Sequence, residues 1–467
     1  MTEARAQSLR LRLRLRRWFA LGVVGLGASI APLDFSVNII FPAMAAAFEL
    51  QPTDIRWAAI GLVLTYGSLM LVFGALGDRV GHLRVFRAGL ALAIVAFSLC
   101  TWAPSFAVLL VGRVLQGISV ALVLSCAPAL ATRVFAESER TVALGAYGSL
   151  NAAAGVLAPV IGGLSLLTVG WQGVFAIRIP IMALAFVASG WLARALRPIG
   201  APRGPHRTSE SRWAATWWLA LGLGLILLAP ALLGELGRPQ AAWIAGVAVL
   251  SAVAGALLLL QFSRAQRSSA RPFLPPTVTR HRPFWTLQLG AVLVQFASFS
   301  VPLIAPFALL GELSAGPLAS GALMATWAMG TLAGSALTPR LTTVWGSARC
   351  TQVALWSAAI GLIMVALWPH VPGMTWMLAS LALQGTALGL FQVAYGDQVI
   401  ASLPAESRGV AGSLTMVTRT VGLVFGASIW IALLRTAGFE TVYWGAAASL
   451  VIFGLLTLRL RHWSIAP

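Results

Sequence analysis

The chain has 467 residues, of which 59% are hydrophobic and only 10% are charged, and its formal net charge is +19. Soluble globular proteins carry about 25% charged residues, so this composition excludes that class and indicates an integral membrane protein. The basic residues are all arginines, and most of them lie in short segments between long apolar runs, which favours a role in membrane orientation over nucleic-acid binding.

The apolar segments predict an all-α integral membrane protein with fourteen spans. A membrane-spanning helix needs about 20 apolar residues. Segments long enough to cross lie at 18–41, 54–76, 85–102, 105–131, 140–168, 173–195, 214–234, 241–262, 284–310, 317–338, 348–368, 373–401, 409–434 and 441–459. If the N-terminus is cytoplasmic, the outer connections carry only Arg56, Arg238 and Arg435, and the other loop arginines face inward. This asymmetry predicts that both termini are cytoplasmic.

The N-terminal residues 1–17 form a basic arm that we expect to lie against anionic lipid on the inner face. A cleaved signal peptide is the alternative, with Ala43–Ala47 as its cleavage site. Asp34 interrupts the apolar stretch and many more spans follow, so we favour a retained first helix.

A charged turn with glycines, Gly74 to Arg84, lies between the second and third spans. Gly81 supplies a backbone conformation that other residues avoid, and Asp78 can accept hydrogen bonds from a helix start. Arg79 and Arg84 mark its side as cytoplasmic. An ordinary basic loop between two helices is the alternative interpretation.

Two opposite charges fall inside apolar spans, where a charged side chain costs at least ~2.5–3.5 kcal/mol. Asp34 lies in the first span and Arg113 in the fourth, and by helix rise their depths differ by about 7 Å. A purely structural buried pair is one interpretation. We favour a carboxylate that takes up and releases a proton, with its protonation tuned by Arg113.

Further polar residues are candidates for a substrate cavity. Arg178 lies about one turn inside the outer end of the sixth span, where snorkelling to water is the alternative. Asp397 is an interfacial residue or a coupling site near the inner end of the twelfth span. Arg419 lies near mid-membrane, where it would contact a substrate anion or pair with Asp397. The other candidates are Asn38, Gln116 and Asn151.

The fifth span carries small residues at helix-packing intervals, including Gly155, Pro159, Gly162 and Gly163. We expect close helix packing there and a bend at which two halves rock. The five histidines lie in loops or tails and the three cysteines are isolated, so we expect no metal site and no cofactor other than the coupling proton.

Two six-helix bundles with an inserted helical hairpin are the predicted organisation. A weak internal repeat supports two related halves: Gly145, Gly155 and Pro159 match Gly412, Gly422 and Gly426 in spacing, and 337–349 is a degraded copy of the charged turn. The predicted units are an arm 1–17, a bundle 18–196, a linker 197–212 expected to be disordered, a hairpin 213–262, a cytoplasmic loop 263–283, a bundle 284–462 and a tail 463–467.

Together these motifs resemble the fourteen-span drug:proton antiporter family within the major facilitator superfamily. The first-span motif is Asp34 to Pro42, the charged turn is the signature loop, Arg113-x-x-Gln116-Gly117 is the fourth-span motif, and Gly155 to Gly163 is the antiporter motif. The resemblance implies alternating access, a central cavity and export driven by proton entry. It also implies that Asp78 and Arg79 latch the bundles on the inner side.

The chain departs from the family pattern at two places. Arg178 stands where the family usually has Asn, and Tyr395-Gly396-Asp397 replaces an apolar region with proline. The extra charge leaves the substrate class open and could favour a more specific, anionic cargo.

We therefore expect a monomeric, proton-coupled exporter of small amphipathic molecules or drugs in a bacterial cytoplasmic (inner) membrane. Its partners would be its small-molecule substrate, protons and the lipid bilayer, with no nucleic acid. The alternatives are a dedicated exporter of one metabolite, siderophore or amino acid and, more remotely, a non-transporting membrane sensor or scaffold. No nucleophile–base pair, metal cluster or phosphate loop suggests an enzyme.

Overall fold

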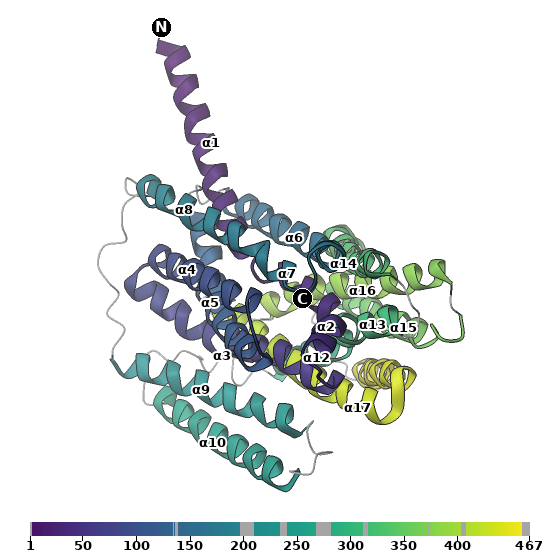
Figure 1. Ribbon diagram of the computed structural model, residues 1–467. Coiled ribbons are helices and arrows are strands. Elements are labelled where there is room, and N and C mark those ends of the chain that lie inside the picture. Colours follow the sequence, from purple (N-terminus) through teal and green to yellow (C-terminus); the bar gives the residue numbers. More distant parts are fainter. Residues whose placement is uncertain are drawn as a thin grey trace.

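The computed structural model describes residues 2–133, 135, 139–196, 210–233, 241–267, 282–311, 316–371, 373–402 and 408–459. All regular structure in these ranges is helical, and the long helices pack side by side (Figure 1). Twelve stretches of the described chain are long and apolar enough to cross a membrane. The all-α membrane fold predicted from composition is therefore confirmed.

The first half of the chain forms one set of packed helices. Helix α5 packs on α3 and α4, α8 packs on α1 and α4, and α6 packs on α2. The helices are α1 (Thr2–Ala28), the 3-10 turn η1 (Pro32–Asp34), α2 (Phe35–Ala47), α3 (Pro52–Val80), α4 (His82–Thr101), α5 (Phe106–Arg133), α6 (Arg140–Thr168), α7 (Gly173–Ala176) and α8 (Arg178–Leu196).

The last part of the chain forms a second set. Helix α16 packs on α14 and α15, and α17 packs on α12 and α15. The helices are α12 (Arg282–Ser298), α13 (Ser300–Leu310), α14 (Pro317–Trp345), α15 (Ser347–Ala366), α16 (Met374–Ala401) and α17 (Arg408–Arg459).

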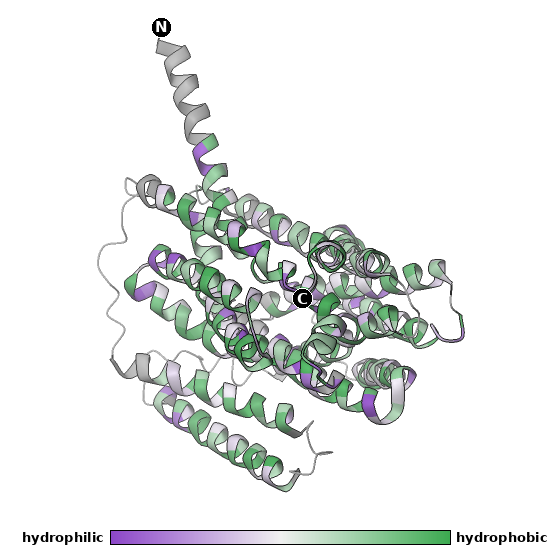
Figure 2. Cartoon of the chain, viewed as in Figure 1, coloured by the Kyte–Doolittle hydropathy of each residue, from purple (hydrophilic) through white to green (hydrophobic). Residues whose placement is uncertain are grey.

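Helices α9 (Glu210–Leu233) and α10 (Ala241–Arg267) pack on each other at one side of the molecule, and α9 also contacts α3 and α17 (Figure 1). Apolar residues run along both of them (Figure 2). The predicted linker and loop are shorter than expected, because residues 210–212 and 263–267 are helical. The rest of the linker, 197–209, and most of the loop, 268–281, lie outside the described residues.

The expected fourteen spans and the twelve apolar stretches differ at two places. Helix α14 has 29 residues but is not among the twelve. Helix α17 has 52 residues and counts once, although Gly438 inside it has a non-helical backbone with φ 81° and ψ 178°. The difference thus concerns one helix of low hydropathy and one helix that is broken near its middle.

The two halves repeat the same helix lengths. Helices α3, α4 and α5 have 29, 20 and 28 residues, and α14, α15 and α16 have 29, 20 and 28. A single glycine with positive φ joins the first two helices of each set: Gly81, at 103°, joins α3 to α4, and Gly346, at 77°, joins α14 to α15. The equivalent fourth helices both carry Leu-Gln-Gly, at 115–117 and 383–385. These matches support the predicted internal repeat.

The first apolar stretch is not a single helix, contrary to the expected continuous span 18–41. Helix α1 begins at Thr2, so the basic arm continues it, and the helix ends at Ala28. Pro32 lacks the N–H that would bond to the carbonyl of Ala28, so the chain turns before α2 begins at Phe35. Asp34 therefore lies at a break between two helices.

Close backbone contact holds α14 against α16. Gly330 and Gly334 on α14 face Gly385 and Gly389 on α16, so each helix presents a Gly-x-x-x-Gly pair. Such pairs let two membrane helices approach until their backbones touch. A Cβ added at Gly389 would lie 2.0 Å from the carbonyl oxygen of Thr331.

We expect Gly389→Ala to destabilise the protein by about 1–3 kcal/mol, because the added methyl group forces two backbones apart. Gly396 lies on the same helix, but a Cβ there would meet nothing within 4 Å. Gly396→Ala is thus the matched control and should unfold at or above the wild-type temperature. Thermal unfolding in detergent measures both; equal unfolding temperatures for the two variants would contradict the predicted contact.

Candidate functional site

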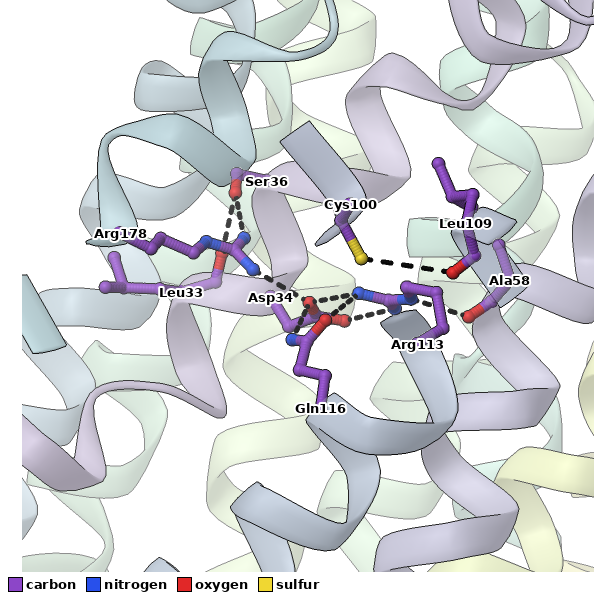
Figure 3. A network of polar contacts seen from close by, with 9 residues as sticks. All are labelled: Leu33, Asp34, Ser36, Ala58, Cys100, Leu109, Arg113, Gln116 and Arg178. Carbon is purple, nitrogen blue, oxygen red and sulfur yellow. Dashed lines mark hydrogen bonds and ion pairs between the residues drawn. The ribbon is translucent and has the colours of Figure 1, made fainter. Parts of the chain in front are cut away.

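The Asp34 carboxylate is bound by two arginines from different helices (Figure 3). Arg113 Nη1 and Nη2 donate to its two oxygens at 2.7 and 2.8 Å, so this pair is bidentate. Arg178 Nη1 donates to Oδ1 at 2.9 Å. Bidentate pairing of arginine with a carboxylate fixes both groups in one geometry.

Arg113 is held in place by its own helix and by a neighbouring one. Its Nε donates to the carbonyl oxygen of Ala58 on α3 at 2.8 Å, and Nη1 also donates to Gln116 Oε1 at 2.7 Å. Gln116 in turn donates from Nε2 to Asp34 Oδ1 at 2.9 Å. The fourth-span pair Arg113 and Gln116 lies one turn apart on α5, and both face the break in the first span.

Arg178 begins α8, just after the short helix α7. Its Nη2 donates to the carbonyl oxygen of Leu33 and to the hydroxyl of Ser36, and its guanidinium lies over the ring of Phe97 at 5.4 Å. Its exposed fraction is 1%, so the snorkelling alternative is wrong. The sequence indicated an unusual charge here, but not that it reaches the first span.

The site has more positive than negative charge. In the described chain, Asp34 is the only acid held by these two guanidinium groups, so the ionised set carries one net positive charge. The Asp34 side chain is 15% exposed, whereas both arginine side chains are 1–2% exposed. A proton can thus reach the carboxylate more readily than solvent can reach either guanidinium.

The antiporter motif packs on this site. A Cβ at Gly162 would lie 2.7 Å from the carbonyl oxygen of Ser36, and one at Gly155 would lie 3.7 Å from Pro32. Gly163 faces the other half, because a Cβ there would lie 2.5 Å from the carbonyl oxygen of Pro317. Helix α6 runs unbroken past Pro159, so these glycines serve close helix approach here, and the predicted bend stays a prediction.

In the described residues, the other sequence candidates do not hydrogen-bond to Asp34. Asn151 donates to the carbonyl oxygen of Tyr147 in its own helix, and Asn38 is buried within α2. Asp397 is exposed and accepts a hydrogen bond from Ser347 at the start of α15. Arg419 donates to Gln392 and not to Asp397, so these two do not form the pair considered above.

The charged turn is shorter than expected, because α3 continues to Val80 and only Gly81 separates it from α4. Asp78 is exposed and lies 3.3 Å from the imidazole of His82. The positive φ of Gly81 confirms its predicted backbone conformation. The latch between the bundles stays a prediction.

Sequence reasoning missed one buried arginine. Arg56 was placed in an outer connection, but it is fully buried in α3 and donates to the carbonyl oxygen of Ala231 at 3.4 Å. It therefore ties α3 to the end of α9. Its position near the start of a span gave no signal, because arginines there usually reach water.

Comparison with known proteins finds transport and resistance proteins over most of the chain. Relatives over most of the chain include the methylenomycin A resistance protein of Bacillus subtilis (27% identity, 92% of this chain, 91% of the relative) and Riboflavin transporter RibZ of Clostridioides difficile (23%, 89%, 88%). A POT family transporter solved in complex with 5-aminolevulinic acid has a similar fold, with TM-score 0.73, 13% identity and coverage of 94% of this chain and 95% of that one.

The sequence pattern of the Major Facilitator Superfamily matches residues 18–262, more than half of the chain. That region contains the Asp34 site and the charged turn. With its all-helical membrane fold and its transporter relatives, this chain belongs to the Major Facilitator Superfamily, a family of transporters and not of enzymes.

Proposed function

We propose that this transporter is a proton-coupled antiporter that exports small amphipathic molecules or drugs by alternating access. The observation that carries the proposal is a single carboxylate, Asp34, held by Arg113 and Arg178 at a break in the first span. Proton binding neutralises Asp34 and weakens its charge-assisted hydrogen bonds to both arginines. The helices that carry these residues, α5 and α8, are then less tightly held to the first span.

The site is placed to influence contact between the two halves. Phe35 follows Asp34 directly, and its ring makes an edge contact with Trp327 of α14 at 5.7 Å. The indole N–H of Trp327 donates to Gln384, the counterpart of Gln116 in the second half. A change in pairing at Asp34 would thus act next to a contact between the halves.

The proposal includes fourteen spans, with α14 as one and α17 as two divided at Gly438. It places α9 and α10 as an inserted hairpin between two six-helix bundles, and both termini in the cytoplasm of a bacterial inner membrane. In it, Asp78 and Arg79 latch the bundles on the inner side, and Gly162 and Gly163 let the bundles slide. The working unit is a monomer, and the proton is the coupling ion.

The alternative is a dedicated exporter of one metabolite on the same fold. The relative named as a riboflavin transporter favours it, and the relative named as an antibiotic resistance protein favours the broader exporter. A sensor or scaffold without transport is a weaker third candidate, because nothing in such a role requires a charged site inside the membrane.

The test is a drug-susceptibility panel on a strain that lacks the gene, combined with efflux measurements in cells expressing it. We expect sensitisation to several amphipathic compounds, and efflux that stops when a protonophore collapses the proton gradient while ATP stays high. Sensitisation to none, with export of one metabolite, would favour the dedicated exporter. Efflux that continues in the presence of the protonophore would refute proton coupling.

A further inference from the structure

A second polar cluster lies between the halves, away from Asp34. Arg419 on α17 donates from Nη2 to Gln392 Oε1 on α16 at 3.1 Å. Tyr66 on α3 is next to Gly67, which contacts Thr420 beside Arg419, and Tyr395 on α16 lies one turn from Gln392. Tyr66 belongs to the first half of the chain, whereas α16 and α17 belong to the second, so the cluster spans the boundary between them.

Arg419 lies deep in the membrane without an acid beside it. It is 11 residues beyond Arg408, the start of α17, which corresponds to about 17 Å along the helix. In the described part of the chain, no carboxylate forms an ion pair with it, and Gln392 accepts its one hydrogen bond. A guanidinium has five N–H donors, and among the described residues only Gln392 accepts from one of them.

The neighbouring side chains keep the arrangement rigid. The amide oxygen of Gln288 accepts hydrogen bonds from the hydroxyls of Tyr395 and Thr418, both at 2.7 Å. These bonds fix α12, α16 and α17 relative to one another beside Arg419. Gln288 is 2% exposed, whereas Arg419 and Tyr66 are partly exposed, so the surface that a ligand can reach belongs to the latter two.

Arg419 lies on the side of α17 turned away from the α9–α10 hairpin at the edge of the molecule (Figure 1). Val417, Val421 and Val424 form a stripe on α17 that packs with α3 and α9. Arg419 is two residues from both Val417 and Val421, which places it about 160° around the helix from that stripe. Contact between Gly67 and Thr420 brings α3 against α17 at this level.

We propose that Arg419 binds the carboxylate of the transported molecule, with Tyr66 and Gln392 as its hydrogen-bonding neighbours. The guanidinium supplies two parallel donors and the Tyr66 hydroxyl a third from the opposite half. An anionic substrate would thereby contact both halves at once. This inference rests on the proposed transport function and narrows its substrates to amphipathic carboxylates.

The test uses 1-naphthoate and its uncharged counterpart 1-naphthamide as probes, with purified full-length protein in detergent and no pH gradient. We expect naphthoate, but not naphthamide, to raise the unfolding temperature and to quench tryptophan fluorescence saturably. Arg419→Gln should weaken naphthoate binding about 10- to 100-fold. Arg419→Lys keeps the charge but loses the planar, bidentate guanidinium group. Its affinity for naphthoate should therefore lie between those of the wild type and Arg419→Gln.

Arg435→Gln is the matched control, because it removes an exposed arginine farther along the same helix. It should bind naphthoate like the wild type. Equal binding of naphthamide, unchanged binding by Arg419→Gln, or no naphthoate binding at all would overturn the proposal. The binding measurement uses no proton gradient, so it does not depend on whether transport is coupled to protons. Absence of naphthoate binding would likewise not refute proton coupling.

Discussion

Replacing Asp34 by Asn should abolish proton-driven transport. Asn keeps nearly the same shape and can still accept hydrogen bonds from Arg113 and Arg178, but it cannot take up a proton in the relevant range. In liposomes loaded with the compound to which the deletion strain is most sensitised, an inward proton gradient should drive efflux by the wild type. With Asp34→Asn the proton gradient should have no effect, and the efflux rate should fall to that of loaded liposomes that contain no protein.

The control for this prediction is Glu440→Gln, which removes a half-exposed acid beside His370. It should retain efflux driven by the gradient. Proton entry coupled to substrate exit is followed with a pH-sensitive dye inside the liposomes. Undiminished, pH-dependent efflux by Asp34→Asn would show that the proton is carried elsewhere.

Arg113→Met should destabilise the protein by about 3 kcal/mol. Removing one partner of a buried ion pair costs ~3–5 kcal/mol, because the remaining charge loses its partner. Here Arg178 still neutralises Asp34, so the lower end of the range applies. The change also leaves the carbonyl oxygen of Ala58 without its hydrogen bond from Arg113.

A second substitution separates charge from packing in this prediction. Each single variant breaks the pair between Arg113 and Asp34, and Arg113→Met/Asp34→Asn breaks the same pair only once, so the double variant should be less destabilised than the sum of the two single variants, although Arg178 then stays buried without its acid. Arg435→Met, at an exposed position, should stay within about 0.5 kcal/mol of the wild type. Chemical denaturation in detergent measures the unfolding free energy of five proteins: the wild type, Arg113→Met, Asp34→Asn, the double variant and Arg435→Met. Simple addition of the two single effects would mean that Arg113 and Asp34 do not interact.

Much of the fold and half of the site were accessible from the sequence. The membrane helices are predictable because burying charge in lipid is costly, so long runs without charge mark the spans. The pairing of Asp34 with Arg113 is predictable because a fixed helix rise gives both residues a similar depth. Gln116, one turn from Arg113, was a candidate without an assigned partner. The Gly-x-x-x-Gly pairs at 330–334 and 385–389 are also visible in the sequence and would have predicted close helix packing, but they were not used for that prediction.

The rest depended on contacts between distant segments. Arg178 lies 144 positions from Asp34, and only the way α7 and α8 pack brings it to the first span. The break before η1 was hidden because Pro32 and Asp34 look compatible with a tilted continuous helix. The position of Arg419 against α3 likewise depends on how the two halves meet.

Helices α3–α5 and α14–α16 match in length but differ in the residues that they contribute to the Asp34 site. The two sets of helices share a glutamine and a glycine joint, yet Arg113 in the first set corresponds to Leu381 in the second. In the described residues, the ion pairs of the Asp34 site are thus formed by the first half alone. A substitution in α14–α16 can therefore change the contacts of the second half without removing an ion pair of the Asp34 site.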